Sequence, residues 1–265
     1  MKYIIEFINN QKQINKIKAK KIPALPNFIR YSDIESEINT IKQIPVGIGK
    51  KDLEIYTYNY LTNQGNIITS QKLTNTITFT KSLLNILKLI PKTSLIIIDP
   101  LNLLMLNKEE YPNYYHDNNL SSILDKLLEY ISNLIETKNN TEGVILIYGL
   151  NKFINKLEDN KKMHELTKKL KTYEKISLIV ADDAPKLKNY GYESWFTEIF
   201  NTNDGIWIGR GITDQNIIKI SGINREMTKE IKKDMGYVIQ DKIPTLCKFI
   251  DFITIDEDGV DNNGE

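Results

Sequence analysis

The segment from Gly65 to Leu87 has the order of residues expected of a phosphate-binding unit. It reads GNIITSQKLTNTITFTKSLLNIL, which is a short apolar strand, a polar loop, and then apolar residues at helical spacing. A Walker A loop, GxxxxGK followed by Ser or Thr, binds phosphates because its glycines let backbone N–H groups point at them. Its lysine reaches the β- and γ-phosphates, and its hydroxyl holds magnesium. Aligned on the junction of strand and helix, the eight positions of such a loop are Ser70, Gln71, Lys72, Leu73, Thr74, Asn75, Thr76 and Ile77.

Every position that this chemistry requires is changed. Ser70 and Asn75 stand in place of the two glycines. Thr76 replaces the lysine and Ile77 replaces the hydroxyl residue, while Lys72 lies too early in the loop to serve without a shift of register. The segment is therefore either a nucleotide-binding loop that has lost its chemistry or an ordinary strand–loop–helix unit. Taken alone, its residues favour the ordinary unit, because short motif matches are often accidental.

The second half of a nucleotide site is a strand that ends in an aspartate and is followed by an acidic general base. The run LIIIDP supplies Asp99 as a Walker B-like residue, but Pro100 occupies the position of the base. Loss of one preorganised group that stabilises charge typically raises a reaction barrier by about 2.7–4 kcal/mol. With the lysine, the magnesium hydroxyl and the base all absent, we expect no ATP hydrolysis, no resident metal, and at most weak binding of ATP with magnesium.

The elements that must position these residues alternate between strands and helices from Gly65 onward, which predicts a parallel sheet with crossover helices. The continuous apolar run of residues 94–99 predicts a central strand that is buried on both faces. Residues 143–149, 175–182 and 204–209 predict further strands, and helical spacing predicts one helix over about 151–172. Near the C-terminus, residues 216–220 and the segment 236–250 predict antiparallel edge strands, the latter turning at 240–242.

The predicted domain organisation has three parts. Residues 1–43 form an extended lead-in that packs on the main domain, because the prolines of IPALP disfavour a helix. Residues 44–255 form one α/β domain, and the acidic, apolar-poor residues 256–265 form a tail predicted to be disordered.

The composition argues against two classes of protein. Lys and Arg number 35 against 34 Asp and Glu, so the chain lacks the basic excess of a dedicated nucleic-acid binder. No run of residues approaches the length of a membrane span. Cys247 is the single cysteine, which excludes an internal disulfide and is typical of a reducing compartment such as the cytoplasm.

Several segments resemble one family in order and spacing. They are IPVGIGKKDLE, SLIIID, LIVADDAPKLKNYGYESWF, NDGIWIGRGITDQ and GYVIQDKIPTLCKFID, which lie between Ile44 and Asp251, and the resemblance covers about residues 22–251. The set is similar to the C-terminal FtsK/SpoIIIE-like ATPase domain of the EssC family, the motor and coupling proteins of the Firmicutes type VIIb secretion system. Its most specific parts are Glu193 with Trp195 and the run from Asp204 to Gly211 followed by Gln215.

This resemblance implies an α/β fold of the P-loop NTPase class, RecA/FtsK-like, with a mostly parallel central sheet flanked by helices. It implies a cytoplasmic domain, excised from a longer motor anchored in the bacterial cell membrane, which contacts the membrane only through that parent protein. The implied partners are secreted substrate proteins of the WxG and LxG types and the other ATPase domains of the parent chain. Distal ATPase domains of the family are frequently degenerate, which agrees with Ser70 to Ile77, and only Asp99 matches the family's site.

Other residues that could carry chemistry have plainer interpretations. Asp182 and Asp183 end a predicted strand at a ligand-binding edge and could hold a cation, but capping is the favoured role. Arg210 could act as an arginine finger, but a solvated loop arginine is favoured, and Trp195 and Trp207 are expected in the core.

Four functions remain open from the sequence. The leading one is a non-hydrolysing module that recognises substrates and regulates the motor. The second is a domain with weak ATP or ADP binding that couples nucleotide state to secretion. A DNA translocase domain is disfavoured by the charge balance, and a purely structural module is the fourth.

Overall fold

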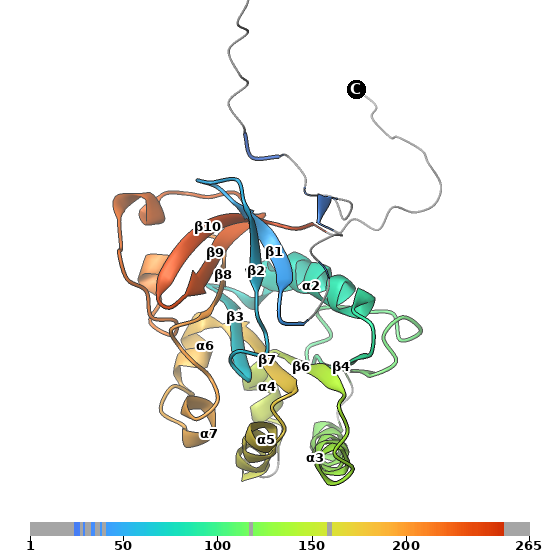
Figure 1. Ribbon diagram of the computed structural model, residues 1–265. Helices are drawn as coiled ribbons and strands as arrows, with labels where there is room; N and C mark the ends of the chain where they lie inside the picture. The colour runs from blue at the N-terminus through green and yellow to red at the C-terminus, as the bar shows by residue number, and fades with distance from the viewer. Residues whose placement is uncertain are drawn as a thin grey trace, which may run out of the picture.

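The computed structural model describes residues 24–26, 29, 33–34, 38, 41–116, 119–157 and 161–251. Within them, one sheet has the strand order β2-β1-β10-β9-β8-β3-β7-β6-β4-β5 (Figure 1). The strands are β1 (Ile44–Gly49), β2 (Ile55–Tyr58), β3 (Gly65–Ser70), β4 (Thr93–Ile98), β5 (Tyr114–Tyr115), β6 (Glu142–Tyr148), β7 (Ile176–Asp183), β8 (Gly205–Ile208), β9 (Met235–Gln240) and β10 (Ile243–Phe249). The helices are η3 (Leu73–Thr76), α2 (Ile77–Leu89), α3 (Leu120–Glu136), α4 (Leu150–Ile154), α5 (Lys161–Thr172), α6 (Ala184–Lys188), α7 (Ser194–Thr197), η4 (Ile212–Asp214) and η5 (Arg225–Thr228).

The sheet has a parallel half and an antiparallel half. The pairs of β3 with β7 and β8, of β7 with β6, of β6 with β4, and of β4 with β5 are parallel. The strands β8, β9, β10, β1 and β2 pair with one another in antiparallel fashion. Because carboxyl ends of parallel strands meet at one edge, the residues that follow β3, β4, β6, β7 and β8 share one side of the molecule.

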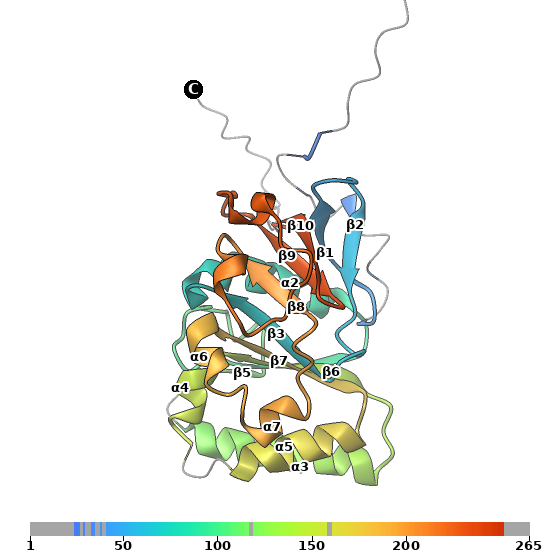
Figure 2. The same cartoon turned by 90° about the vertical axis from the view of Figure 1, so that its left-hand side faces the viewer.

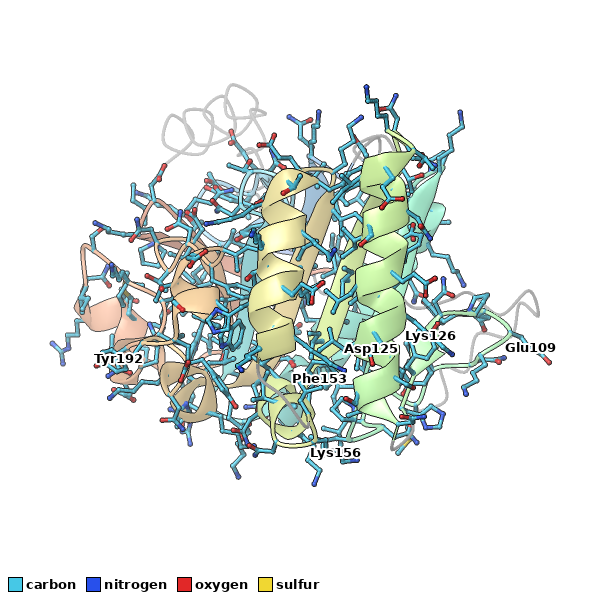
Figure 3. All side chains as sticks on the ribbon, turned by 90° about the horizontal axis from the view of Figure 1, so that it is seen from below. Glu109, Asp125, Lys126, Phe153, Lys156 and Tyr192 are labelled. Atoms are coloured by element: carbon cyan, nitrogen blue, oxygen red, sulfur yellow. The ribbon has the colours of Figure 1, made fainter. Side chains whose placement is uncertain are left out.

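Helices cover both faces of the sheet, and alternate strand residues divide between two cores. Ile145 and Ile147 of β6 pack in the core with α3 and α5, whereas Val144 and Leu146 pack in the opposite core with α2. Figure 2 shows α3 and α5 on one side of the sheet. Figure 3 views this side directly, with the two helices side by side and Asp125 labelled on α3. The carboxylate of Asp125 pairs with Lys162 of α5 at 2.7 Å.

The predicted α/β class with a mostly parallel sheet and flanking helices is confirmed, but four of its details are wrong. The strand β4 is next to the last strand and not central. Only its end is paired on the outer side, where Ile97 and Ile98 meet the two residues of β5, so the residues from Thr93 to Ile96 are only partly buried.

The second and third corrections concern the C-terminal strands. The β9–β10 hairpin turns at 241–242 as predicted, but β1 and β2 lie beyond it, so it is internal to the sheet. Residues 216–220 form no strand. The side chain of Gln215 takes the place of a strand partner there, because its Oε1 accepts the N–H groups of Ile217 and Ile218, each at 2.8 Å.

The fourth correction concerns the predicted helix over 151–172, which is two helices, α4 and α5. Helical spacing of apolar residues continues from one to the other, so spacing alone could not separate them. The core assignments of Trp195 and Trp207 are confirmed, since both are buried. Cys247 is buried as well, and burial raises the pKa of its thiol to about 12.

The predicted terminal parts are mostly outside the described residues. In the lead-in 1–43, the described residues Ile29, Ile34 and Ile41 are buried in the core that contains α2. The tail 256–265 lies wholly outside the described residues. Among the described helices, none combines the length and apolar character needed to cross a membrane.

Candidate functional site

The eight predicted loop positions lie at the carboxyl end of β3, at the edge where the parallel strands end. Ser70 is the last residue of β3, the single turn η3 runs from Leu73 to Thr76, and α2 begins at Ile77. Leu73, which is central in the loop, is 4% exposed, and Ser70 and Thr76 are fully buried. Gln71, Lys72, Thr74 and Asn75 are exposed. The loop thus buries one apolar and two hydroxyl side chains, and its other polar side chains face outward.

Side chains of the loop hydrogen-bond within it and to Tyr148 at the end of β6, which is separated from β3 by β7. The Asn75 Nδ2 donates to Ser70 Oγ at 3.0 Å. The hydroxyls of Thr76 and Tyr148 lie 2.9 Å apart, and each lies within hydrogen-bonding distance of the Leu73 carbonyl oxygen, at 2.8 and 2.9 Å. Burial raises the pKa of Tyr148, so its hydroxyl stays protonated as a donor. Position 76 is therefore a buried hydroxyl bonded inward, where a Walker loop would extend a lysine toward phosphate.

Asp183, the last residue of β7, holds the loop from the strand that pairs directly with β3. Its Oδ1 accepts the backbone N–H of Leu73 in a short hydrogen bond. Its Oδ2 pairs with Lys186 Nζ at 2.6 Å, from the following helix α6. The hydrogen bond to Asp183 raises the pKa of Lys186 above its usual 10.5.

Asp182 holds a different segment. Its Oδ2 accepts the N–H of Asn151 at the start of α4 at 2.7 Å, and its Oδ1 accepts the N–H of Asp183 at 2.8 Å. Burial raises the pKa of Asp182 despite these bonds. Both aspartates thus accept backbone N–H groups, which agrees with the capping role favoured from the sequence. Within the described residues, no three His, Cys, Asp or Glu side chains are grouped to bind a metal ion.

Asp99 follows β4, which is separated from β3 by β7 and β6. Three strand spacings place β4 roughly 14 Å from β3 along the sheet. The Asp99 Oδ2 accepts the N–H of Leu104 at 2.7 Å and the hydroxyl of Tyr114 at 3.0 Å, and its Oδ1 is buried without a hydrogen-bond partner. The described contacts of Asp99 therefore belong to the segment that follows β4, and a Walker B-like role for it remains a prediction.

Sequence reasoning missed two residues of this site, Tyr148 and Lys186. Tyr148 ends the predicted strand 143–149, and the shared edge of parallel strands was a signal that could have placed it near the loop. The sequence carried no comparable signal for Lys186, because the helix α6 was not predicted.

A hollow of about 620 Å³ opens on the outer side of the loop. Its wall includes Thr74, Asn75 and Thr78 on one side and Lys232 and Lys233 on the other. This volume is in the range of small-molecule sites. Arg210 also borders it, and this arginine is 67% exposed and paired with Glu230 at 2.6 Å, which agrees with the favoured reading of a loop arginine.

Comparison with known proteins gives a clear result for the fold. No protein-family model and no curated protein matches the sequence. Among solved structures, the cytoplasmic domain of EssC matches 92% of this chain and 51% of its own length, with a TM-score of 0.66 and 14% identity. EssC ATPases 2 and 3 from Geobacillus thermodenitrificans match 92% of this chain and 49% of theirs, with a TM-score of 0.66 and 16% identity.

A third similar structure is Thermomonospora curvata EccC (ATPases 2 and 3) in complex with a signal sequence peptide. It matches 89% of this chain and 45% of its own length, with a TM-score of 0.65 and 14% identity. This chain therefore spans about half the length of each of the three structures. The resemblance predicted from the sequence is confirmed at the level of the fold, and this chain has the P-loop ATPase fold of the EssC and EccC cytoplasmic domains.

Proposed function

We propose that this chain is a non-hydrolysing ATPase-fold module of a type VII secretion motor, which takes part in recruiting substrate proteins and in regulating the motor. The observation that carries the non-hydrolysing part is the loop after β3. Leu73 and Thr76 of the loop point inward, and the Leu73 N–H is engaged by Asp183. A phosphate bound by the backbone N–H groups of the loop would compete with Asp183 for that N–H group.

The missing groups support the same proposal. Thr76 and Ile77 replace the lysine and the magnesium hydroxyl, and Pro100 follows Asp99 where a general base would stand. Loss of one such group typically raises the barrier to reaction by about 2.7–4 kcal/mol. The proposal therefore involves no resident nucleotide or metal.

Recruitment is proposed because the fold is that of secretion ATPases. The Thermomonospora curvata EccC structure contains a signal sequence peptide. By analogy, the proposed partners are secreted proteins of the WxG and LxG types and the other ATPase domains of a longer parent chain. We place the module on the cytoplasmic side, with contact to the membrane only through that parent.

The hollow beside the loop favours one alternative, which is weak binding of ATP or ADP that couples nucleotide state to secretion. Its volume suits a nucleotide, and the exposed Lys232 and Lys233 could attract phosphates. Asp234 and Asp251 line the same hollow and oppose an anion there. The wall of the hollow therefore carries charges of both signs, so weak nucleotide binding is the less favoured of the two functions.

Isothermal titration with Mg-ATP separates the two functions. The leading proposal expects no heat of binding at micromolar nucleotide. Clear micromolar binding to the unaltered chain would overturn it. If such binding were lost in a Lys232→Ala/Lys233→Ala variant but kept in a Lys161→Ala/Lys162→Ala control on α5, the hollow would be the nucleotide site.

Recruitment is tested by fluorescence anisotropy with labelled peptides from the ends of WxG-type and LxG-type substrates. We expect saturable binding of at least one such peptide and none of its scrambled version. If no peptide bound and deletion of this module from the parent motor left export of every substrate intact, recruitment would be abandoned in favour of a structural role.

A further inference from the structure

The carboxylate of Asp183 is held by the two kinds of group with which a Walker loop holds a phosphate. One is a backbone N–H of the loop, that of Leu73, which contacts Oδ1. The other is a lysine ammonium, Lys186 Nζ, which lies 2.6 Å from Oδ2. Phosphate-binding loops use backbone N–H groups at a helix start together with a lysine. Here the lysine comes from α6 and not from the loop.

We infer that Asp183 is the resident anion of the loop 70–77, an internal carboxylate that takes the place of a bound phosphate and holds the loop closed without nucleotide. This inference rests on the part of the proposed function in which no nucleotide fills the loop. It explains how a loop with no glycine and no lysine of its own at the required positions stays ordered at the start of α2.

The electrostatics of the site support this assignment. The turn η3 and α2 follow one another directly, and neither Lys72 nor Thr76, the residues at their N-caps, accepts a backbone N–H through its side chain. The first turns contain no acidic residue. A carboxylate at the start of a helix is favourable because the free N–H groups there carry partial positive charge. Asp183 supplies that carboxylate from β7, 110 residues along the chain.

The neighbouring carboxylates do not take this role. Asp182 is engaged by the N–H groups of Asn151 and Asp183. Asp99 is engaged by Leu104 and Tyr114. Asp183 is thus the carboxylate that the described hydrogen bonds connect to the loop.

Hydrogen exchange at the Leu73 amide tests the inference in Asp183→Ala. A hydrogen bond to a charged acceptor protects its donor, so we expect exchange at Leu73 to be faster by roughly 10-fold or more. The matched control is Asp125→Ala, which removes a paired surface aspartate on α3; this helix packs in the core opposite to the one that contains Leu73, so exchange at Leu73 should stay within about twofold. Equal exchange in the wild type and Asp183→Ala would overturn the inference.

Rescue by a small anion tests whether charge matters. Excess sodium acetate should restore protection of the Leu73 amide in Asp183→Ala, whereas acetamide, and sodium chloride at the same ionic strength, should not. Rescue by acetamide as strong as by acetate, or no rescue at all, would show that the loop does not hold an anion. If Asp183→Ala does not fold, Asp183→Asn replaces it, because a neutral amide oxygen accepts the hydrogen bond more weakly and exchange should still be faster by about threefold.

The same protein preparation distinguishes this inference from the proposed function. Micromolar Mg-ATP binding by the wild type would overturn the part of the proposed function in which no nucleotide is bound, whereas the acetate result would still hold for the loop in the absence of nucleotide. Unchanged exchange at Leu73 in Asp183→Ala would overturn the resident anion and leave the absence of nucleotide binding to be explained by Thr76 and Ile77 alone.

Discussion

Asp99 and Asp183 both lie at the carboxyl ends of parallel strands, at the same edge of the sheet, and both accept a backbone N–H, yet they hold different loops. Asp99 is fully buried and binds within the segment that follows its own strand, at Leu104 and Tyr114. Asp183 is partly exposed, paired with Lys186, and reaches across to the loop of β3. The position of a carboxylate at the end of a strand therefore does not decide its role. The role depends on which strand lies next to it.

The strand order explains the difference. β7, which ends in Asp183, pairs directly with β3, whereas β4, which ends just before Asp99, is separated from β3 by two strands. A carboxylate next to the loop can replace the anion that the loop would otherwise bind. One that lies three strand spacings away stabilises only its own surroundings.

The largest effect is expected for Asp99→Ala. It leaves the buried N–H of Leu104 and the hydroxyl of Tyr114 without this acceptor and opens a small cavity, so we expect the free energy of unfolding to fall by about 3 kcal/mol. Urea denaturation measures it. Exchange at the Leu73 amide, relative to global unfolding, should not change.

The control for that prediction is Asp99→Asn. This variant keeps an oxygen that can accept the two hydrogen bonds, and it replaces Oδ1, which has no hydrogen-bond partner in the wild type. We expect it to change the free energy of unfolding by less than about 1 kcal/mol. A loss as large as that of the alanine variant would mean that the charge of Asp99 matters, which would revive a role in binding a cation.

Asp183→Ala should have a smaller global effect and a local one. Loss of a carboxylate that caps a helix start lowers the free energy of unfolding by about 1.5 kcal/mol. Urea denaturation again measures it, and selective exposure of the 70–77 amides distinguishes it from Asp99→Ala. If the two variants lost stability equally and exposed the same amides, the contrast between the two carboxylates would be wrong.

Tyr148→Phe tests the contribution of β6 to the same loop. Its hydroxyl lies 2.9 Å from both Thr76 Oγ1 and the Leu73 carbonyl, and Thr76 still donates to that carbonyl in its absence. We therefore expect a loss of about 1 kcal/mol in the free energy of unfolding, measured with urea. Tyr58→Phe is the matched control, since the buried Tyr58 hydroxyl has no hydrogen-bond partner and its removal should be neutral or stabilising. If both variants lost the same free energy of unfolding, the Tyr148 hydroxyl would not stabilise the loop.

Most of the fold could be predicted from the sequence because it depends on local patterns. The apolar runs that became β3, β4, β6, β7 and β8 and the helical spacing of α2 and α3 are visible over a few residues. The strand order is not local, so β4 was expected at the centre and the hairpin at the edge. The prediction of a strand over 216–220 is wrong for a similar reason. The backbone N–H groups of Ile217 and Ile218 donate to the side chain of Gln215 and not to a neighbouring strand.

The candidate site was predictable in part, for the same reason. The eight loop positions follow from linear spacing, and their missing glycines and lysine could be read directly. The groups that hold the loop could not be predicted from the sequence, because Tyr148 and Asp183 lie 75 and 110 residues along the chain from Leu73, which they contact. The paired carboxylates 182–183 were noticed, but only the structure separates the one bound to α4 from the one bound to the loop.

The smallest effect is expected for Lys186→Met, which removes the cation from Asp183 and keeps the length of the side chain. The lysine side chain is 44% exposed, so solvent screens the pair and the free energy of unfolding should fall by no more than about 0.5 kcal/mol. The pKa of Lys186 is raised above 10.5, so this contribution is fully present below pH 10.5 and is lost as the pH rises through the raised value. Urea denaturation at pH 7 in low and high salt measures it, and the difference from wild type should shrink in high salt. A loss at Lys186 as large as that at Asp183 would instead make the ion pair, and not the hydrogen bond to Leu73, the interaction that holds the loop.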